Sequence, residues 1–296
     1  MSIQKERRMC EEKRRVPTLY LVGTPIGNLQ DMTYRAVAVL KTVPLIAAED
    51  TRHTRELLTH FDIHTRLTSY HEHNKAAKGA ELIAFMAEGN DLACVTDAGL
   101  PGISDPGSDL AARAIAAGFS VSPVPGANAA LSALIASGLD TRRFSFVGFL
   151  PRQKKKRTEL LQGIKDYEET LLFYEAPHHL RETLAALCDV LGPRLMAAGR
   201  ELTKRYEAFH RGTIPELIAY FLDTPPRGEF VLVVAGRDET ADEAEFHEKS
   251  PMEVYEANLA AGVPKKEAMR LVAKALGLSR RDIYKLVLAQ EQGKAP

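Results

Sequence analysis

Short apolar runs alternate with segments of helical periodicity along most of this 296-residue chain. Residues 19–22, Leu45–Ala48 and Leu92–Val95 are apolar at nearly every position, which is typical of strands buried on both faces. Between such runs, segments such as 78–88 and 108–117 repeat their apolar residues every three or four positions. Strands that alternate with helices form largely parallel sheets covered by those helices, so we expect an α/β fold.

The alternation falls into two blocks, so we expect two α/β domains, at residues 16–125 and 126–236. The last expected strand, 229–234, is apolar on both faces and should be central in its sheet. Outside the two blocks we expect a disordered basic arm at 1–15, an acidic linker at 237–249 and a helical segment at 250–296.

The C-terminal segment carries two helix patterns. Lys265–Ala275 has the period of an amphipathic helix, and Gly277 follows as a stop signal. Ser279 would cap a second helix, with Asp282 three residues later. The side chains expected to face inward are Ala268, Leu271, Val272, Ala275, Ile283, Leu286 and Val287. Two short helices around a Gly turn resemble a helix-turn-helix; a helical pair docked on the main body is the alternative.

Charge and cysteine content exclude several classes of protein. Lys plus Arg number 39, as do Asp plus Glu, so the formal net charge is zero and any nucleic-acid surface must be local. Cys10, Cys94 and Cys188 form no C-x-x-C pair, which argues against a disulfide framework and a zinc site. Such widely spaced cysteines fit a reducing compartment, so we expect a cytoplasmic protein. No apolar run approaches the ~20 residues of a membrane span.

A loop rich in glycine and proline, residues that restrict or permit particular backbone conformations, follows the run Leu92–Val95. Its twelve residues, 96–107, contain three glycines, two prolines and two aspartates. Ligands of open α/β sheets bind at the carboxyl ends of the strands, so this loop suits a small molecule. Similar loops end other expected strands, and together the six should line one cleft between the two domains. The five others are 23–28, 49–55, 125–129, 174–179 and 199–204.

Several common enzyme signatures are missing from the sequence. There is no G-x-G-x-x-G after the first strand and no P-loop, which disfavours a nicotinamide enzyme or a P-loop NTPase. The sequence also lacks G-x-S-x-G and H-E-x-x-H. His71 and His73, and the pair His178 and His179, lack the spacing of a metal site, so no metal is expected.

Ordered matches along the chain resemble the tetrapyrrole methylase superfamily. They comprise residues 23–29, 48–52, 69–74, 96–107, 124–129 and 173–178, and the resemblance runs from about residue 19 to 236. Within the superfamily, the sequence is most similar to a branch that transfers a methyl group from S-adenosylmethionine to the 2′-hydroxyl of a cytidine in small-subunit ribosomal RNA. The resemblance also implies a homodimer.

The resemblance implies that S-adenosylmethionine lies folded in the cleft between the two domains. Asp97 is then placed to accept hydrogen bonds from the ribose or the amino group, although helix capping is the alternative for Asp97 and Ser104. The residues expected to bind this cofactor are Thr24, Pro25, Asp97, Gly99, Leu100, Pro101, Ile103, Ser104, Asn128, Ala129, Tyr174 and Glu175.

A 2′-hydroxyl is a poor nucleophile, so its methylation needs in-line geometry and a base or a nearby cation. Glu49 and Asp50 are acids in a loop at the expected cleft and are the candidates for the base. Lys204 or Arg200 could stabilise the developing alkoxide. The alternative is that residues 49–52 form only the ion-paired start of a helix.

A basic run at the start of an expected helix indicates the RNA surface. Residues 152–157 carry five positive charges, although cations at a helix N-terminus oppose its dipole. An unfavourable placement suggests an external phosphate; a merely solvated face is the alternative. The residues expected to contact RNA are Arg52, Arg152, Lys154, Lys155, Lys156 and Arg157.

Two other functions are compatible with the sequence. The first is C-methylation of a tetrapyrrole precursor, which would need a broad hydrophobic trough for the macrocycle. The second is a non-catalytic RNA-binding assembly factor that keeps the cleft only as a scaffold. Cofactor binding would separate the second from either enzyme.

Overall fold

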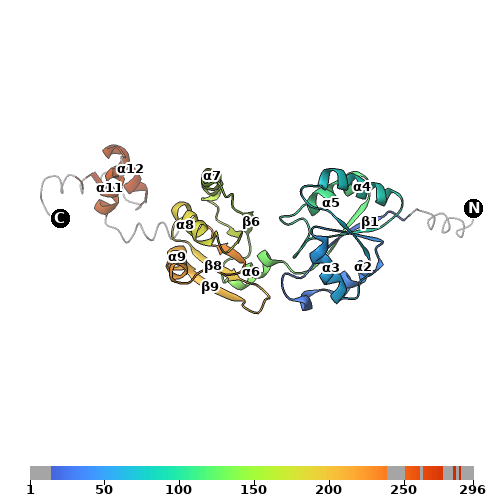
Figure 1. The fold of residues 1–296 in the computed structure, drawn as a ribbon. Coiled ribbons are helices and arrows are strands. Elements are labelled where there is room, and N and C mark those ends of the chain that lie inside the picture. The colour runs from blue at the N-terminus through green and yellow to red at the C-terminus, as the bar shows by residue number, and fades with distance from the viewer. Residues whose placement is uncertain (1–14, 239–250, 261–262, 276–282, 285–286, 288–296) are drawn as a thin grey trace, which may run out of the picture. The chain divides into compact units, whose positions relative to one another are not determined.

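The computed structural model describes residues 15–238, 251–260, 263–275, 283–284 and 287 (Figure 1). The chain divides into two compact units, Met1–Ala235 and Gly236–Pro296. Nearly all of the expected basic arm and all but the first two residues of the expected acidic linker lie outside the described residues.

The first sheet of the N-terminal unit is entirely parallel, as the alternating pattern predicted, with strand order β3-β2-β4-β1-β5. Its strands are β1 (Thr18–Val22), β2 (Leu45–Ala48), β3 (Arg66–Ser69), β4 (Leu92–Val95) and β5 (Ser120–Val124). β2 and β4 are buried at every position because helices cover both faces of the sheet. All five strands therefore end at one edge.

Two helices cover each face of this sheet (Figure 1). α2 (Tyr34–Thr42) and α3 (Thr51–His60) pack on one face through Ala36, Leu40 and Leu58. α4 (Lys75–Ala87) and α5 (Gly107–Ala116) pack on the other through Leu82, Met86, Leu110 and Ala114. A single turn of 3-10 helix, Leu29–Asp31, precedes α2.

The second sheet is mixed, with order β6-β7-β10-β8-β9, so the expectation of a parallel sheet is wrong for this half. Only β6 and β7 are parallel; β10 runs opposite to both of its neighbours, and β8 is antiparallel to β9. The cause is the short connection between β8 and β9, which reverses the chain without a crossover helix. The strands are β6 (Phe144–Phe149), β7 (Thr170–Glu175), β8 (Leu195–Arg200), β9 (Ala208–Thr213) and β10 (Phe230–Val234).

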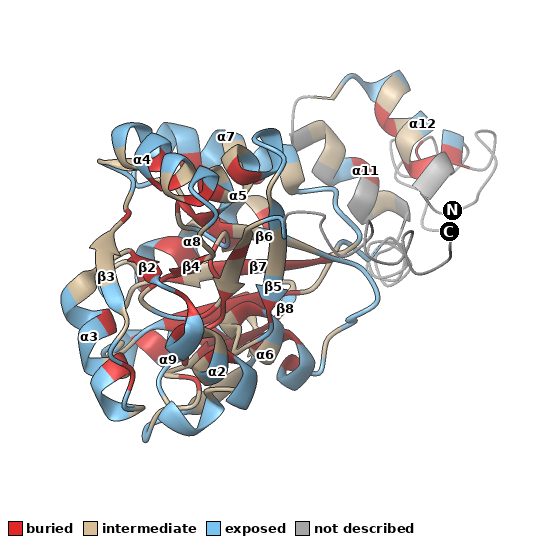
Figure 2. Ribbon diagram, turned by 90° about the vertical axis from the view of Figure 1, so that its right-hand side faces the viewer, coloured by how far each residue is buried: buried red, intermediate tan, exposed pale blue. Residues whose placement is uncertain are grey.

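β10 is buried at all five positions and lies at the centre of its sheet, as predicted. Its side chains alternate: Phe230, Leu232 and Val234 pack on one face, and Val231 and Val233 on the other. α7 (Lys154–Ile164), α8 (Leu180–Leu191) and α9 (Ile214–Asp223) cover the first face, and α6 (Ala129–Ser137) covers the second. Figure 2 shows the buried residues gathered in the strands and along the inner faces of these helices.

α6 begins and ends where its local signals predict. The side chain of Asn128 accepts a hydrogen bond from the backbone N of Leu131 at 2.9 Å. Gly138 ends the helix with a φ of 85°, which suits a residue without a Cβ. The helix therefore follows directly from the expected cleft loop 125–129 and fixes the direction of that loop.

The C-terminal unit contains α11 (Pro251–Ala260) and α12 (Lys265–Ala275), the latter at the predicted bounds. Ala268 and Val272 are buried as expected, together with Tyr255, Ile283 and Val287. Gly277, Ser279 and Leu286 lie outside the described residues, so the helix-turn-helix stays a prediction. In the part of the chain that the structure describes, no helix is both long and apolar enough to cross a membrane.

Candidate functional site

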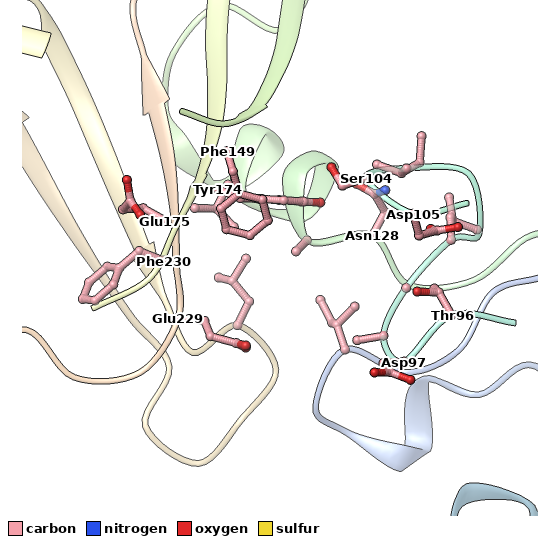
Figure 3. Close-up of a pocket in the computed structure, with 18 of the residues that line it drawn as sticks. Thr96, Asp97, Ser104, Asp105, Asn128, Phe149, Tyr174, Glu175, Glu229 and Phe230 are labelled. Atoms are coloured by element: carbon pink, nitrogen blue, oxygen red, sulfur yellow. The ribbon is translucent and has the colours of Figure 1, made fainter. Parts of the chain in front are cut away.

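All six predicted loops contribute residues to one cavity of about 480 Å³ in the N-terminal unit. This confirms that they share a cleft, and its volume is within the usual range for small-molecule sites, about 300–1,000 Å³. Figure 3 shows Thr96, Asp97, Ser104 and Asp105 on one side and Phe149, Tyr174, Glu175, Glu229 and Phe230 on the other. Each loop supplies at least one lining residue; examples, in the order of the chain, are Ile26, Glu49, Asp97, Asn128, Tyr174 and Lys204.

The loop 96–107 is fixed by main-chain and carboxylate hydrogen bonds. The backbone N of Thr24 donates to the carbonyl of Gly99 at 2.9 Å, and the backbone N of Gly99 donates to the carbonyl of Thr24 at 3.2 Å. Gly99 has a φ of 88°, a conformation that favours glycine. Further along the loop, Asp105 accepts from the backbone N of Gly102 at 2.9 Å and of Gly107 at 2.7 Å. The backbone of this wall of the cavity is therefore set without any ligand.

Two glycines allow the first and fourth loops to touch. A Cβ on Gly126 would lie 2.9 Å from Gly23 Cα and 3.0 Å from its carbonyl carbon, which is closer than real side chains approach. Because both neighbours are backbone, a side chain here forces the loops 23–28 and 125–129 apart.

We expect Gly126→Ala to lower the free energy of unfolding by about 1–3 kcal/mol, the usual cost of overpacking, and to weaken ligand binding in the cavity. Thermal denaturation and calorimetry would measure the two effects. Gly163→Ala is the matched control, because Gly163 is in α7 and an added Cβ meets nothing within 4 Å. Equal stability of the two variants would contradict the close approach.

Hydrogen bonds to Glu49 and Asp97 connect the loops that follow β2 and β4. The hydroxyl of Thr96 donates to Glu49 Oε2 at 2.6 Å, and the backbone N of Asp50 donates to Asp97 Oδ1 at 3.0 Å. Burial raises the pKa of Asp97, and the nearby charge of Glu49 acts in the same direction. Glu49 and Asp97 both line the cavity.

Asp50 has a different environment from Glu49. Its side chain accepts from the backbone N of Arg52 at 2.8 Å as the N-cap of α3, and its Oδ2 pairs with the Arg52 guanidinium at 2.8 Å. The hydrogen bond from Arg52 lowers the pKa of Asp50 to about 2. Neither Asp50 nor Arg52 is among the residues that line the cavity. The two residues instead form the ion-paired start of a helix, which was the alternative interpretation of residues 49–52.

Lys204 is held between two carboxylates at the opposite side of the cavity. Its Nζ lies 3.0 Å from Glu201 Oε1 and 2.9 Å from Glu229 Oε2. Partial burial opposes the charge, but the bonds to Glu229 and Glu201 outweigh it and raise the pKa of Lys204. A Cβ on Gly27 would lie 2.4 Å from Lys204 Cγ, so that glycine makes room for the lysine stem.

The residues expected to bind the cofactor fall into two groups. Nine of the twelve line the cavity, whereas Thr24, Pro25 and Pro101 are buried within the loops that form it. Helix capping does not account for Asp97 or Ser104, because α5 begins after Pro106 without a side-chain cap. The nine lining residues are Asp97, Gly99, Leu100, Ile103, Ser104, Asn128, Ala129, Tyr174 and Glu175.

The basic run before and within α7 is not uniform. Arg152, Lys154, Lys155 and Lys156 are exposed, as expected for a surface that meets phosphate. Arg157 differs: its side chain is 6% exposed and bonded to Glu182 of α8 at 2.6 Å. Its inclusion among the RNA contacts is therefore corrected, because a guanidinium packed between two helices cannot reach a phosphate.

Four lining residues lie outside the six predicted loops and were not among the expected site residues: Phe149, Glu229, Phe230 and Val231. Glu201 lies in the loop 199–204 but was not singled out either. Glu201 has a φ of 48°, which no local signal predicts for a non-glycine residue. Phe149 follows Gly148 in a strand, and a glycine inside a strand pattern is a signal for a bulge. No cluster of potential metal ligands occurs among the described residues.

Comparisons with known proteins give the family. Residues 18–218 match the model of the Tetrapyrrole (Corrin/Porphyrin) Methylases. A protein of Halalkalibacterium halodurans called ribosomal RNA small subunit methyltransferase I is 51% identical over 271 residues, which is 91% of this chain and 94% of the relative. Its namesake from Bacillus subtilis is 49% identical over 269 residues, 90% of this chain and 92% of the relative.

Two solved structures share the fold. Uroporphyrin-III-C-methyltransferase from Thermus thermophilus has a TM-score of 0.51 at 24% identity and covers 74% of this chain and 94% of its own. Diphthine synthase has a TM-score of 0.56 at 14% identity, and the match covers 74% of this chain and 90% of diphthine synthase. The chain therefore belongs to the tetrapyrrole (corrin/porphyrin) methylase family and is an S-adenosylmethionine-dependent methyltransferase.

Proposed function

We propose that this methyltransferase transfers the methyl group of S-adenosylmethionine to the 2′-hydroxyl of a cytidine in small-subunit ribosomal RNA. The observation that carries the proposal is a single cavity. It is lined by the loops expected to bind the cofactor, by the carboxylate of Glu49 and by the ammonium of Lys204. Relatives that are 51% and 49% identical over nine-tenths of the chain bear the name of a small-subunit RNA methyltransferase. The described residues give no comparable support for a tetrapyrrole substrate.

The charge of the cavity suits the methyl donor, which when bound supplies a methyl group on a positively charged sulfur. Six carboxylates and one ammonium line the cavity, so the lining favours a cation. The six are Glu49, Asp97, Asp105, Glu175, Glu201 and Glu229. Gly99 and Leu100 add close backbone approach and apolar surface for a planar ring, and Asp97 can accept hydrogen bonds from ribose hydroxyls.

The acceptor oxygen needs to lose a proton as the new bond to carbon forms. Glu49 lines the cavity and would accept this proton, while the bond from Thr96 holds its carboxylate in place. Lys204 would stabilise the developing negative charge on the 2′-oxygen. Asp50 is a weaker candidate for the base, because its oxygens already bind Arg52 and the first turn of α3.

The RNA surface would be the four exposed cations that follow β6, namely Arg152, Lys154, Lys155 and Lys156. None of the four is buried, and among the described residues the one ion pair that involves them, between Lys155 and Glu159, is long at 3.9 Å. Such cations attract phosphates and release counterions when RNA binds. The small ribosomal subunit would be met in the cytoplasm, and the enzyme would act there as a homodimer.

Salt should weaken RNA binding but leave cofactor binding almost unchanged. With about 0.7 counterions released per phosphate contact, four contacts predict roughly a 50-fold loss of RNA affinity between 50 and 200 mM salt. Replacing Lys154, Lys155 and Lys156 by alanine should lower the slope of log affinity against log salt by about 2. Filter binding would measure the RNA and calorimetry the cofactor; an unchanged slope would overturn this surface.

The function itself is tested by incubation with labelled S-adenosylmethionine. Purified small-subunit RNA and the assembled subunit are the two acceptor arms, and digestion to nucleosides should yield labelled 2′-O-methylcytidine from at least one arm. Label on a base, or no label on either RNA while a tetrapyrrole precursor is methylated, would overturn the proposal.

A further inference from the structure

A bulge interrupts β6 next to the cavity. β6 pairs with β7 in parallel, but Phe146 is opposite Leu172 and Gly148 is opposite Phe173, so Val147 is an extra residue. Gly148 has a φ of 74°, which accommodates the change in direction. Bulges of this kind re-aim side chains beside active sites.

The bulge brings two phenylalanines to the same face of the sheet. In a regular strand, residues three apart point to opposite faces. Here Phe146 and Phe149 both contact the ring of Tyr174 edge-on, with centroids 5.0 and 5.5 Å away, while Val147 packs toward the core of the other face. The result is an aromatic cluster of Phe146, Phe149 and Tyr174, two of which line the cavity.

Phe149 is the exposed member at the cavity. It keeps 61% of its surface exposed, and Figure 3 shows its side chain beside Tyr174, facing the space that Ser104 and Asn128 border from the other side. An exposed phenyl ring costs free energy in water, so its place in the lining suits a planar ligand that covers it. Tyr174 is more buried and contacts the Phe149 ring edge-on.

Positive charges that follow Phe149 closely in sequence indicate which planar ligand this is. Arg152 follows Phe149 by three residues, and the exposed lysines 154–156 come directly after. A stacking ring beside backbone-binding cations is how proteins hold unpaired nucleotides. An adenine ring alone would give no reason for four exposed cations at this point. The carboxylates of a tetrapyrrole precursor could also pair with them, and the names of the relatives favour RNA.

We propose that Phe149 stacks on the nucleobase of the acceptor nucleotide, which enters unpaired, while the four cations hold the phosphates beside it. This rests on the proposed function, since it assigns the acceptor side of the same cavity. Phe149 is then a positioning residue: it fixes the base so that the attached ribose is presented to the methyl donor. It takes no part in proton transfer.

The chain contains no tryptophan, which permits a direct test. Phe149→Trp introduces a single indole at the stacking position, and Phe144→Trp introduces one on the same strand at a residue that is 42% exposed and outside the cavity lining. Small-subunit RNA should quench the fluorescence of the first variant in the presence of the cofactor, and leave that of the second nearly unchanged.

Kinetics supply the second readout. Phe149→Ala should lower kcat/KM for RNA about 10- to 100-fold, the usual loss when a stacked base loses its ring, with an unchanged KM for S-adenosylmethionine. Phe149→Tyr should restore most of the loss, because it keeps the ring. Phe144→Ala should match the wild type.

Three results would overturn the proposal: an unchanged kcat/KM for RNA in Phe149→Ala, quenching by S-adenosylmethionine alone with no further change on adding RNA, or equal quenching of the two tryptophan variants. The wild-type enzyme separates this failure from that of the proposed function. If it methylates small-subunit RNA, these results refute only the stacking; if it does not, the function itself is wrong.

Discussion

Replacing Glu49 by glutamine should slow methyl transfer to RNA by about 10²- to 10⁴-fold, the range lost when a positioned general base is removed. The amide keeps the shape of the side chain but cannot take the proton of the 2′-hydroxyl. Single-turnover experiments with saturating cofactor and RNA measure this step without product release. The affinity for S-adenosylmethionine should change only a few-fold.

Cofactor affinity needs its own measurement because Glu49 has structural contacts. Its Oε2 accepts from the hydroxyl of Thr96 at 2.6 Å, and Thr96 precedes Asp97 in the cofactor loop. If the substitution displaced this loop, calorimetry would show weaker cofactor binding together with the slower turnover. A loss confined to affinity would assign Glu49 to the cofactor wall and remove it as a base.

Asp50→Asn is the matched control for Glu49→Gln. Asparagine caps a helix as well as aspartate does, and a fully exposed ion pair such as the one with Arg52 contributes little to stability. We therefore expect turnover within a few-fold of the wild type. A large loss in Asp50→Asn, with normal turnover in Glu49→Gln, would exchange the two assignments.

Most of the first sheet could be predicted from the sequence because local signals and tertiary structure agree there. The wholly apolar runs Leu45–Ala48 and Leu92–Val95 become β2 and β4. β3 was not predicted, because three of its four residues are polar. The Gly- and Pro-rich loops mark the ends of those strands. Their meeting in one cavity follows from parallel strands ending at a common edge.

Strand direction in the second sheet could not be predicted in the same way. β10 is apolar at every position, and such a run is equally compatible with parallel and antiparallel neighbours. The reversal between β8 and β9 places Glu201 and Thr203 at φ values of 48° and 65°, and neither residue signals this conformation. The antiparallel pairs therefore depend on tertiary contacts.

Arg157 belongs to a run of positive charges in the sequence but is buried in the structure. In sequence it is one of several neighbouring cations, but helical geometry puts it on the same face as Leu161, four residues later. Both are buried, and Glu182 neutralises the guanidinium. Helical periodicity, rather than charge alone, would have separated Arg157 from the exposed lysines.

Lys204→Met should lower the rate of methyl transfer by about 10²- to 10³-fold, the usual loss when one group that stabilises a developing oxyanion is removed. Methionine has a similar length and fits beside Gly27, so the change removes the charge more than the volume. The ammonium is held at 3.0 Å from Glu201 and 2.9 Å from Glu229, and this fixed position lets it act without reorganisation. Single-turnover rates with saturating RNA are the measurement, and Lys204→Arg should retain more activity because it keeps the charge.

A purely structural role for Lys204 gives a different pattern, because its loss also removes the cation that neutralises two carboxylates beside the acceptor. Repulsion between those carboxylates and a developing alkoxide could then account for the slower rate. Combining Lys204→Met with Glu201→Gln and Glu229→Gln removes that repulsion without restoring the cation. If the ammonium stabilises the transition state, the triple variant should stay at least tenfold slower than the double variant Glu201→Gln/Glu229→Gln, in which Lys204 is present. Equal rates for these two variants would show that Lys204 only neutralises its neighbours, and the stabilising cation would have to come from elsewhere in the complex with RNA.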